Sequence, residues 1–396
     1  MMFCEKPIGE IADVTKLAGF EFTKYIKYNE TGEIIALRAL NLRKGELDLS
    51  DIKRIDRSVS EGLTRSKLYE NDIILTYTGN GYGDCAIIEE NDKYHLAPNI
   101  CKIVPNRALV EPYFLYSYIR SNDFYKQMSS NMTGSGQPTI PMKTIRTLKV
   151  PVPQMEIQKK IANIIQAINL KLRTNRAINE NLEQQAQAIF ANEFLSLESL
   201  PDGWKRGSLI DIADYLNGLA MQKYRPAADE VGIPVLKIKE LRQGCCDATS
   251  ELCSPNIKTN YIIHDGDVIF SWSGSLLVDF WCGGTCGLNQ HLFKVTSSEY
   301  DKWFYYAWTK HHLERFIAVA ADKATTMGHI KRDELSKAEV LIPNEADYNR
   351  IGSLLHPIYD LIITNRIESK NLAETRDTLL PKLMSGEIDI SEVDYE

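Results

Sequence analysis

Hydrophobic and polar residues follow two patterns along the chain, and each pattern occurs twice. Short β-branched runs bounded by turn residues predict strands. They are followed by stretches in which apolar residues recur every three or four positions, as in an amphipathic helix. The predicted strands are Ile34–Leu40, Asp72–Thr78, Ala86–Glu89 and Ile100–Val104, then Val235–Ile238, Asp267–Trp272 and Leu292–Val295. Shorter helices are predicted at Pro112–Gln127 and near Asp301–Val319.

The second half of the chain repeats the first in the same order, at an offset that shortens gradually. A repeat of this length is the signature of a duplicated structural unit. Ile11-Ala12-Asp13 returns as Ile212-Ala213-Asp214, Lys24-Tyr25 as Lys223-Tyr224, Asp72–Gly79 as Asp267–Gly274, and Val150-Pro151-Val152-Pro153 as Val340-Leu341-Ile342-Pro343. Asn175-Arg176 likewise returns as Asn365-Arg366.

A long helix is predicted after each Pro-bounded strand, and His356-Pro357 predicts a kink early in the second one. The apolar positions predicted to pair the two helices are Ile161, Ile165, Ile168, Leu172, Leu182, Ile351, Leu355, Ile358, Ile362 and Leu372. A helix of about 40 residues spans ~60 Å, so the pair would act as an antiparallel coiled-coil strut. The alternative is a local helical hairpin packed on one core.

These patterns predict a mixed α/β (α+β) fold in which two similar domains are separated by the two long helices. The expected boundaries are 1–153 for the first domain, 154–199 for the first long helix, 200–343 for the second domain, and 344–396 for the second helix and the tail.

Composition narrows the picture only slightly. The chain has 396 residues and a net charge of −7, which argues against a protein that coats DNA with its whole surface. No apolar run is long enough for a membrane span, and no secretory signal is visible, so we expect a cytoplasmic protein without a membrane partner. The eight cysteines lack the C-x2-C pairs of strong zinc sites, so reduced thiols are favoured over a metal site.

The ends of the two repeats resemble the specificity subunit of type I restriction–modification systems. The similar segments are the junction at residues 150–162 and the C-terminal sequence at residues 379–389. The resemblance implies two target recognition domains that read the halves of a bipartite, asymmetric site in double-stranded DNA. It also implies that the helices set the spacer and dock two methyltransferase subunits, and that restriction/translocase subunits join the complex. S-adenosylmethionine is expected on the partner methyltransferase, and no cofactor is expected on this chain. The second junction departs from the family's usual Pro-x-x-x-Glu-Gln pattern, so docking there is expected to differ in detail.

DNA contacts should divide into basic residues at phosphates and polar or aromatic residues at bases. Matched basic residues in the two repeats and three polar loops supply the candidates. These are Lys24, Arg38, Arg43, Tyr77, Thr78, Asn80, Tyr82, Ser135, Gln137 and Lys143 in the first repeat, and Lys223, Lys237, Lys239, Arg242, Trp272, Ser273, Ser275, Gln290, His291, Thr325 and Lys331 in the second. Each alone is also compatible with an ordinary surface or packing role.

Enzymatic motifs are weak, so we expect a non-catalytic subunit. The chain has no Pro-Pro dipeptide for a methyltransferase motif and no Walker A loop, and Gly79–Gly83 lacks the spacing of a dinucleotide loop. Glu368-Ser369-Lys370 matches a nuclease fragment but lies on a predicted helix without a matching strand. The alternative function is a duplicated coiled-coil scaffold whose α/β domains bind protein. A third interpretation, the recognition half of a fused restriction enzyme, has no remaining catalytic domain to support it.

Overall fold

The computed structural model describes residues 3–43, 45–79, 81–134, 136–322 and 332–392. The chain forms two compact units: residues 1–170 with 374–396 make unit 1, and residues 171–373 make unit 2. The division passes through both long helices, so each unit contains a part of each. The boundaries expected from the sequence follow the repeat instead, and they stay a prediction.

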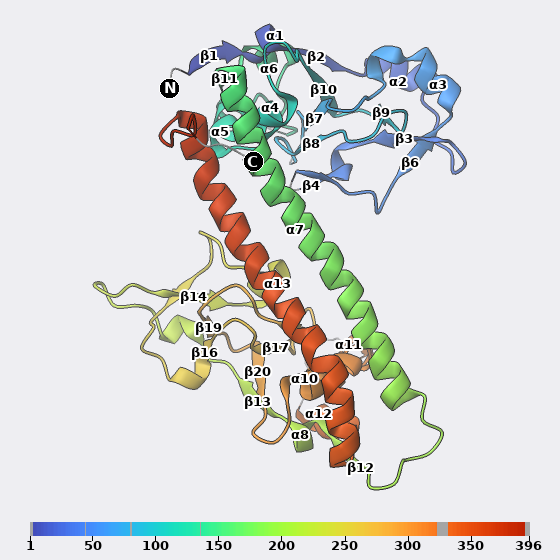
Figure 1. Ribbon diagram of the computed structural model, residues 1–396, viewed down its shortest axis with the longest axis vertical. Helices are drawn as coiled ribbons and strands as arrows, with labels where there is room; N and C mark the ends of the chain where they lie inside the picture. Colours follow the sequence, from blue (N-terminus) through green and yellow to red (C-terminus); the bar gives the residue numbers. More distant parts are fainter. Residues whose placement is uncertain (1–2, 44, 80, 135, 323–331, 393–396) are drawn as a thin grey trace. The chain divides into compact units, whose positions relative to one another are not determined.

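Unit 1 is built on an antiparallel sheet of order β2-β10-β7-β8 (Figure 1). Its strands are β2 (Ala12–Lys16), β10 (Ile100–Pro105), β7 (Ile73–Thr76) and β8 (Cys85–Ile87). Ile73 and Leu75 pack into one apolar cluster with the helices α1 (Ile8–Ile11), α4 (Pro112–Ile119) and α6 (Met142–Thr147), whereas Ile74 packs into a second cluster on the opposite face. Because both faces are covered, this strand is apolar throughout rather than alternating.

A smaller sheet supplies the second cluster of unit 1. Strand β3 (Ile34–Leu37) runs parallel to β9 (Tyr94–Leu96) and antiparallel to β6 (Lys53–Ile55). The ribbon of β1 (Cys4–Pro7) with β11 (Lys149–Val152) pairs the two ends of the α/β region, and β4 (Leu42–Arg43) pairs with β5 (Glu46–Leu47). The remaining helices are α2 (Gly19–Tyr25), α3 (Arg57–Gly62) and α5 (Asn122–Ser130).

Unit 2 repeats this topology, which confirms the duplication seen in the sequence. Its central sheet has the order β13-β20-β17-β18, formed by β13 (Asp214–Asn217), β20 (Leu292–Thr296), β17 (Val268–Ser271) and β18 (Leu277–Phe280). Strand β14 (Ile233–Leu236) again runs parallel to its neighbour, β19 (Cys286–Leu288). The other elements are β12 (Lys205–Ser208), α8 (Leu209–Ile212), α9 (Ile238–Gln243), β15 (Leu252–Cys253), β16 (Ile262–Ile263), α10 (Lys302–His311), α11 (Leu313–Asp322), α12 (Arg332–Ser336) and β21 (Glu339–Ile342).

Three predicted elements end differently in the structure. The helix predicted at Pro112–Gln127 is two helices, because the Ser121 hydroxyl accepts the Phe124 N–H and starts a new helix at a fresh N-cap. The helix predicted near Asp301–Val319 divides at His312. The strand predicted to reach Leu40 stops at Leu37, because the Asn41 side chain accepts the Arg38 N–H and closes a 3₁₀ turn.

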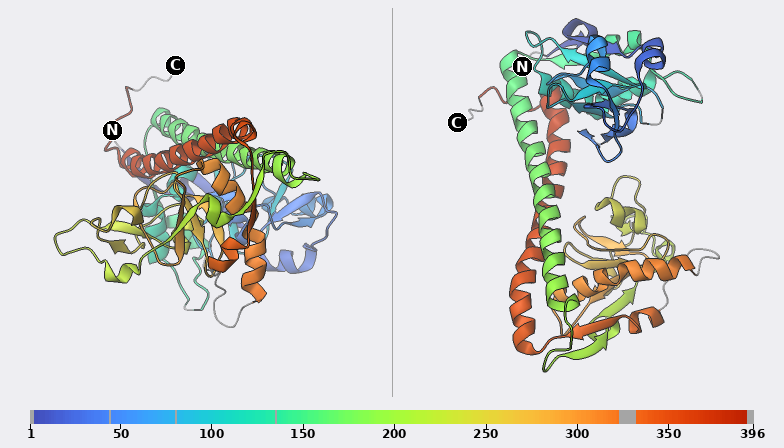
Figure 2. Two further views of the ribbon diagram at one scale, coloured as in Figure 1. Left: turned by 90° about the horizontal axis from the view of Figure 1, so that it is seen from below. Right: turned by 90° about the vertical axis from the view of Figure 1, so that its right-hand side faces the viewer.

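The first long helix, α7 (Met155–Phe190), ends in a π-helical turn at Ala191–Leu195, short of the predicted residue 199. The second, α13 (Glu345–Ser385), continues as a helix through Pro357, so the expected interruption is not seen. Within unit 2 the two helices lie side by side and antiparallel (Figure 2). Lys171 pairs with Glu368 at one level, and Glu193, in the turn after α7, pairs with Arg350 at another.

Burial along the predicted pairing stripe is uneven. Ile161, Ile165, Ile351, Leu355 and Ile362 are buried, whereas Ile168, Leu172, Leu182, Ile358 and Leu372 are half-buried. Ile178 also fits the apolar spacing, yet its side chain is 40% exposed. Amides are buried instead: the Asn365 Nδ2 donates to Asn179 Oδ1 at 2.9 Å, and Asn175 Nδ2 donates to Glu368 Oε2 at 2.7 Å.

The two junctions start their long helices with different side chains. At the first, the buried Gln158 donates to the Pro153 carbonyl at 2.9 Å and accepts the Glu111 N–H. At the second, the Asn344 side chain accepts the Asp347 N–H at 2.9 Å, which is the bond of a helix N-cap. Asn344 therefore caps the second long helix at the junction where the sequence departs from the Pro-x-x-x-Glu-Gln pattern.

Candidate nucleic-acid interface

Two of the polar loops predicted in the first repeat lie against each other in unit 1. Tyr77 and Thr78 follow β7, and the Thr78 hydroxyl is 2.6 Å from that of Thr139. The Gly79 N–H donates to the Pro138 carbonyl at 2.9 Å, and the φ of Gly79 is +82°, which favours glycine. The loop after β7 and the loop before Ile140 thus form one surface with exposed Gln137 beside them.

Aromatic side chains and one lysine extend this surface. The Lys16 ammonium, at the end of β2, lies 5.2 Å from the centre of the Tyr77 ring. Tyr82 stacks on the partly exposed Tyr125 with ring centres 5.2 Å apart, and hydrogen bonds with Ser129 and Tyr125 lower the pKa of Tyr82. A cation, stacked rings and hydroxyls together suit contacts with phosphates and bases.

Unit 2 brings four predicted residues together at the corresponding place. Trp272, after β17, donates its indole N–H to Asn217 Oδ1 at 3.0 Å. The Ser273 hydroxyl is 3.1 Å from His291 Nδ1, and Gln290 Nε2 is 3.4 Å from His291 Nε2. The fifth residue of this group, Ser275, contributes its backbone carbonyl, which accepts a hydrogen bond from Ser271. Amide, imidazole and hydroxyl groups that converge on one loop cluster can donate to or accept from base edges.

Lys16, Asn217, Tyr125 and Thr139 were missed by the sequence interpretation. The repeat carried a usable signal for two of them, because Lys16 and Asn217 stand three residues after the matched aspartates Asp13 and Asp214. Each contacts the aromatic residue that follows the central strand, Tyr77 or Trp272.

Four of the predicted phosphate contacts have acidic partners in the structure. Arg38 pairs with Asp51 at 3.0 Å, Arg43 with Asp48 at 3.4 Å and Lys239 with Asp247 at 3.1 Å, and Lys237 pairs with Glu251. Lys237 and Arg225 lower the pKa of Glu251 through hydrogen bonds. Exposed ion pairs contribute only ~0–1 kcal/mol. These four residues therefore remain predicted phosphate contacts, which would exchange an acidic side chain for a phosphate on binding DNA.

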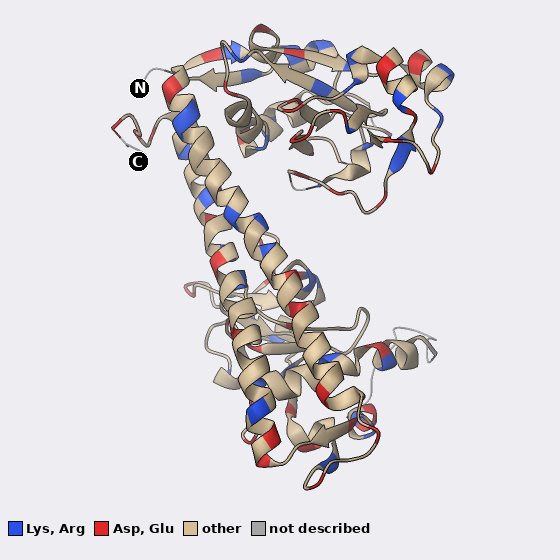
Figure 3. Cartoon of the chain, turned by 45° about the vertical axis from the view of Figure 1, so that its right-hand side comes forward, with Lys and Arg blue, Asp and Glu red and all other residues tan. Residues whose placement is uncertain are grey.

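Four other predicted cations are exposed and have no acidic partner within the described residues: Lys24, Lys143, Lys223 and Arg242. Lys24 lies 5.0 Å from the centre of the Tyr25 ring. Lys and Arg are otherwise interspersed with Asp and Glu along the long helices (Figure 3). Asn80, Ser135, Thr325 and Lys331 lie outside the described residues.

In the described ranges, no group of three or more His, Cys, Asp or Glu side chains could hold a metal ion. Cys85, Cys101, Cys253, Cys282 and Cys286 are buried thiols, and burial raises the pKa of Cys85 to about 12. No helix in the part of the chain that the structure covers is long and apolar enough to cross a membrane.

Several known proteins are similar to this chain in sequence or in fold. The type I restriction enzyme MjaIX specificity subunit of Methanocaldococcus jannaschii is 25% identical over 74% of this chain and 72% of its own length. The HindI specificity subunit of Haemophilus influenzae is 20% identical over 93% and 96%. The crystal structure of the type I restriction-modification system S subunit from M. genitalium has the same fold, with a TM-score of 0.61, 14% identity and 96% of each chain covered.

One protein family matches the chain twice. Residues 3–184 and 201–374 each match the type I restriction modification DNA specificity domain. Each match contains one copy of the duplicated α/β topology with its polar loop cluster. The chain therefore belongs to the family of type I restriction–modification DNA specificity proteins.

Proposed function

We propose that this chain is the sequence-recognition subunit of a type I restriction–modification complex and reads a bipartite, asymmetric site in double-stranded DNA. The observation that carries the proposal is that the specificity-domain family matches the chain twice. In each matched part a cluster of polar loops follows the strands of the central sheet. One cluster contains Tyr77, Thr78 and Gln137, and the other contains Trp272, Ser273 and His291. Because their side chains differ, the two clusters would read different half-sites.

The long helices would separate the two recognition domains as an antiparallel coiled-coil strut, around a pseudo-two-fold axis created by the repeat. The 36 residues of α7 correspond to a length of ~54 Å at ~1.5 Å per residue. The buried amides of Asn175, Asn179 and Asn365 support this role, because polar residues in a helix pair specify its register.

Partner subunits would bind the helices. Leu170 in unit 1 and Ile178, Leu354 and Leu361 in unit 2 are large apolar side chains that are 40–59% exposed. Leu354 and Leu361 are seven residues apart and so lie on the same face of α13, where they would contribute to a partner surface. Two methyltransferase subunits, which would bring S-adenosylmethionine, and restriction/translocase subunits are the proposed partners. This chain would supply recognition and no catalysis.

The test is adenine-methylation mapping of host DNA by single-molecule sequencing, with the gene intact and deleted. Loss of one split motif on deletion is the expected result. A Trp272→Ala strain should keep the half-site read by the first domain and relax the other. An unchanged methylome, in cells that express this chain and its methyltransferase, would favour a scaffold that binds protein through its α/β domains.

A further inference from the structure

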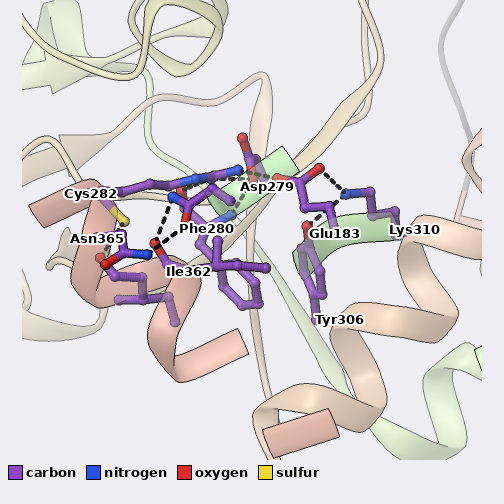
Figure 4. A network of polar contacts seen from close by, with 11 residues as sticks. Glu183, Asp279, Phe280, Cys282, Tyr306, Lys310, Ile362 and Asn365 are labelled. Atoms are coloured by element: carbon purple, nitrogen blue, oxygen red, sulfur yellow. Dashed lines mark hydrogen bonds and ion pairs between the residues drawn. The ribbon is translucent and has the colours of Figure 1, made fainter. Parts of the chain in front are cut away.

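A single arginine in unit 2 joins both long helices to the central sheet of the second α/β region. Arg366, on α13, places Nη1 2.6 Å from Asp279 Oδ1 and Nη2 2.8 Å from Glu183 Oε1. Figure 4 shows the two carboxylates, labelled Asp279 and Glu183, within the network of polar contacts. Asp279 belongs to the edge strand β18, and Glu183 belongs to α7. The guanidinium therefore lies where three elements meet that are far apart in sequence.

The ion pairs extend into a fourth element. The second oxygen of Glu183, Oε2, is 3.5 Å from Lys310 Nζ on α10, and that ammonium donates to the Tyr306 hydroxyl at 3.1 Å. The Arg366 side chain is only 26% exposed. Burial alone lowers the pKa of Arg366, but Asp279, Tyr306 and Glu183 outweigh it and hold the pKa above its ordinary value. The guanidinium is charged in the folded protein, as arginine is in general, and the carboxylates of Asp279 and Glu183 balance that charge.

Aromatic rings pack at the same place. Phe280 stacks on Tyr306 with ring centres 3.8 Å apart, and both contact the ring of Tyr359 on α13. The stabilisation from burying these rings depends on the buried area and is non-directional, although the ring pairs also prefer particular offsets. A guanidinium fork between two carboxylates is directional, because its hydrogen bonds demand a fixed plane and distance.

The two helices are also held in register beside this arginine. Asn365, the residue before Arg366, donates to Asn179 Oδ1 at 2.9 Å, and Asn179 donates to the Ile362 carbonyl at 3.3 Å. The amide that joins the two helices and the arginine that reaches the sheet are therefore adjacent residues on α13.

We propose that Arg366 is a positioning residue that holds the second recognition domain at one angle on the helix pair and so restricts the number of base pairs tolerated between the two half-sites. The inference rests on the proposed function. One base pair advances the DNA by ~3.4 Å. A shift of the second domain by that distance on the helix pair would break the Arg366 bonds of 2.6 and 2.8 Å.

The experiment maps methylation in strains that carry the intact gene, Arg366→Gln or Arg366→Lys. The readout is the number of methylated motifs with the normal spacer divided by the number with one base pair more or fewer. We expect this ratio to fall about tenfold in Arg366→Gln, which corresponds to ~1.4 kcal/mol. The ratio in Arg366→Lys should lie between those of the intact gene and Arg366→Gln, because a lysine keeps the charge but cannot bind two carboxylates with the planar geometry of a guanidinium. The half-site sequences should stay unchanged in both.

Arg350→Gln is the matched control. Arg350 is on the same helix and binds both oxygens of Glu193 at 3.0 and 2.7 Å, and its ion pairs within the described residues are with Glu193 and Asp347, outside the sheet. This variant should keep the normal spacer ratio. If Arg366→Gln does not accumulate in cells, Asp279→Asn is the second variant. It weakens the Arg366–Asp279 ion pair and should also lower the spacer ratio.

Two outcomes would overturn the inference: a normal spacer ratio in Arg366→Gln and Asp279→Asn at normal protein levels, or equal relaxation in Arg350→Gln. A failure of the proposed function would look different. In that case deletion of the intact gene would remove no split motif, and the inference would fall with it.

Discussion

Lys102→Met would test how strongly the core of unit 1 depends on one buried ion pair. Lys102 on β10 and Asp72 before β7 are 8% and 5% exposed, and Lys102 Nζ is 3.6 Å from Asp72 Oδ2. The ammonium also donates to the Lys67 carbonyl at 2.7 Å. Burial raises the pKa of Asp72, and the Tyr69 N–H and Lys102 partly offset this. Methionine would fill the space but remove the nearest counter-charge of the carboxylate, leaving only the weaker influence of Arg107.

Removing one partner from a buried pair costs ~3–5 kcal/mol. Asp72 keeps the hydrogen bond from the Tyr69 amide at 2.9 Å, so the expected loss at pH 7 is about 3 kcal/mol, the lower end of this range. The loss depends on pH. Without Lys102 the folded-state pKa of Asp72 lies further above its unfolded value, so the folded state binds a proton more tightly. The deficit is therefore largest at neutral pH and shrinks as the pH falls toward the folded-state pKa of Asp72.

The assay is hydrogen exchange of the β7 and β10 amides in the full chain. Tryptophan fluorescence during urea unfolding is an internal control, because every tryptophan lies in unit 2: Trp204, Trp272, Trp281, Trp303 and Trp308. Its midpoint should not move in Lys102→Met. The repeat provides a matched variant, Lys294→Met, whose partner Asp267 is 23% exposed and 2.7 Å away. Greater solvation there should make the loss smaller. A loss for Lys102→Met below about 1 kcal/mol, or one independent of pH, would refute the reasoning.

Three further predictions concern unit 2. Phe194→Ala should cost about 3–5 kcal/mol in urea unfolding, because the ring is 2% exposed and packs against Trp204 and Trp308; an unchanged fluorescence midpoint would contradict this. Burial lowers the pKa of His312 to about 4, so the folded state resists protonation and unit 2 should lose stability as the pH falls from about 6.5 toward 4; His312→Gln should flatten that pH dependence of the fluorescence midpoint. Trp272→Ala should relax one half-site only in methylation mapping, and equal relaxation of both would argue against separate recognition clusters.

Local patterns predicted the parts of the fold that depend on short-range order. The strand around Ile73–Leu75 and its counterpart at Val268–Phe270 are apolar runs bounded by turns, and both are central strands. The repeat predicted that the two sheets share a topology. Helix ends were predicted less well, because a single capping hydroxyl, that of Ser121, divides a stretch whose apolar spacing is continuous.

Contacts between distant residues could not be predicted in this way. Asn175 and Asn365 continue the three-and-four spacing of the apolar stripes, so the spacing places them on the buried faces, but their hydrogen-bond partners depend on which helix lies opposite. The ion pairs of Arg366 can be predicted only when residues 183, 279 and 366 are known to converge. Pairing of Lys237 with Glu251 and of Arg38 with Asp51 is equally invisible in the sequence, although it decides which cations are available to phosphates.

The β1–β11 and β12–β21 ribbons have a consequence for how this protein can change. In each ribbon the first strand of an α/β region pairs with its last, so the chain enters and leaves that region on neighbouring strands, ~4.8 Å apart. A region whose ends are adjacent can be replaced by another of different size without moving the start of the long helix that follows. Under the proposed function, recombination at two points that are close in space would then exchange one recognition region and leave the other α/β region and the long helices unchanged. New specificities can thus arise by replacing a whole module rather than by successive substitutions at the bases.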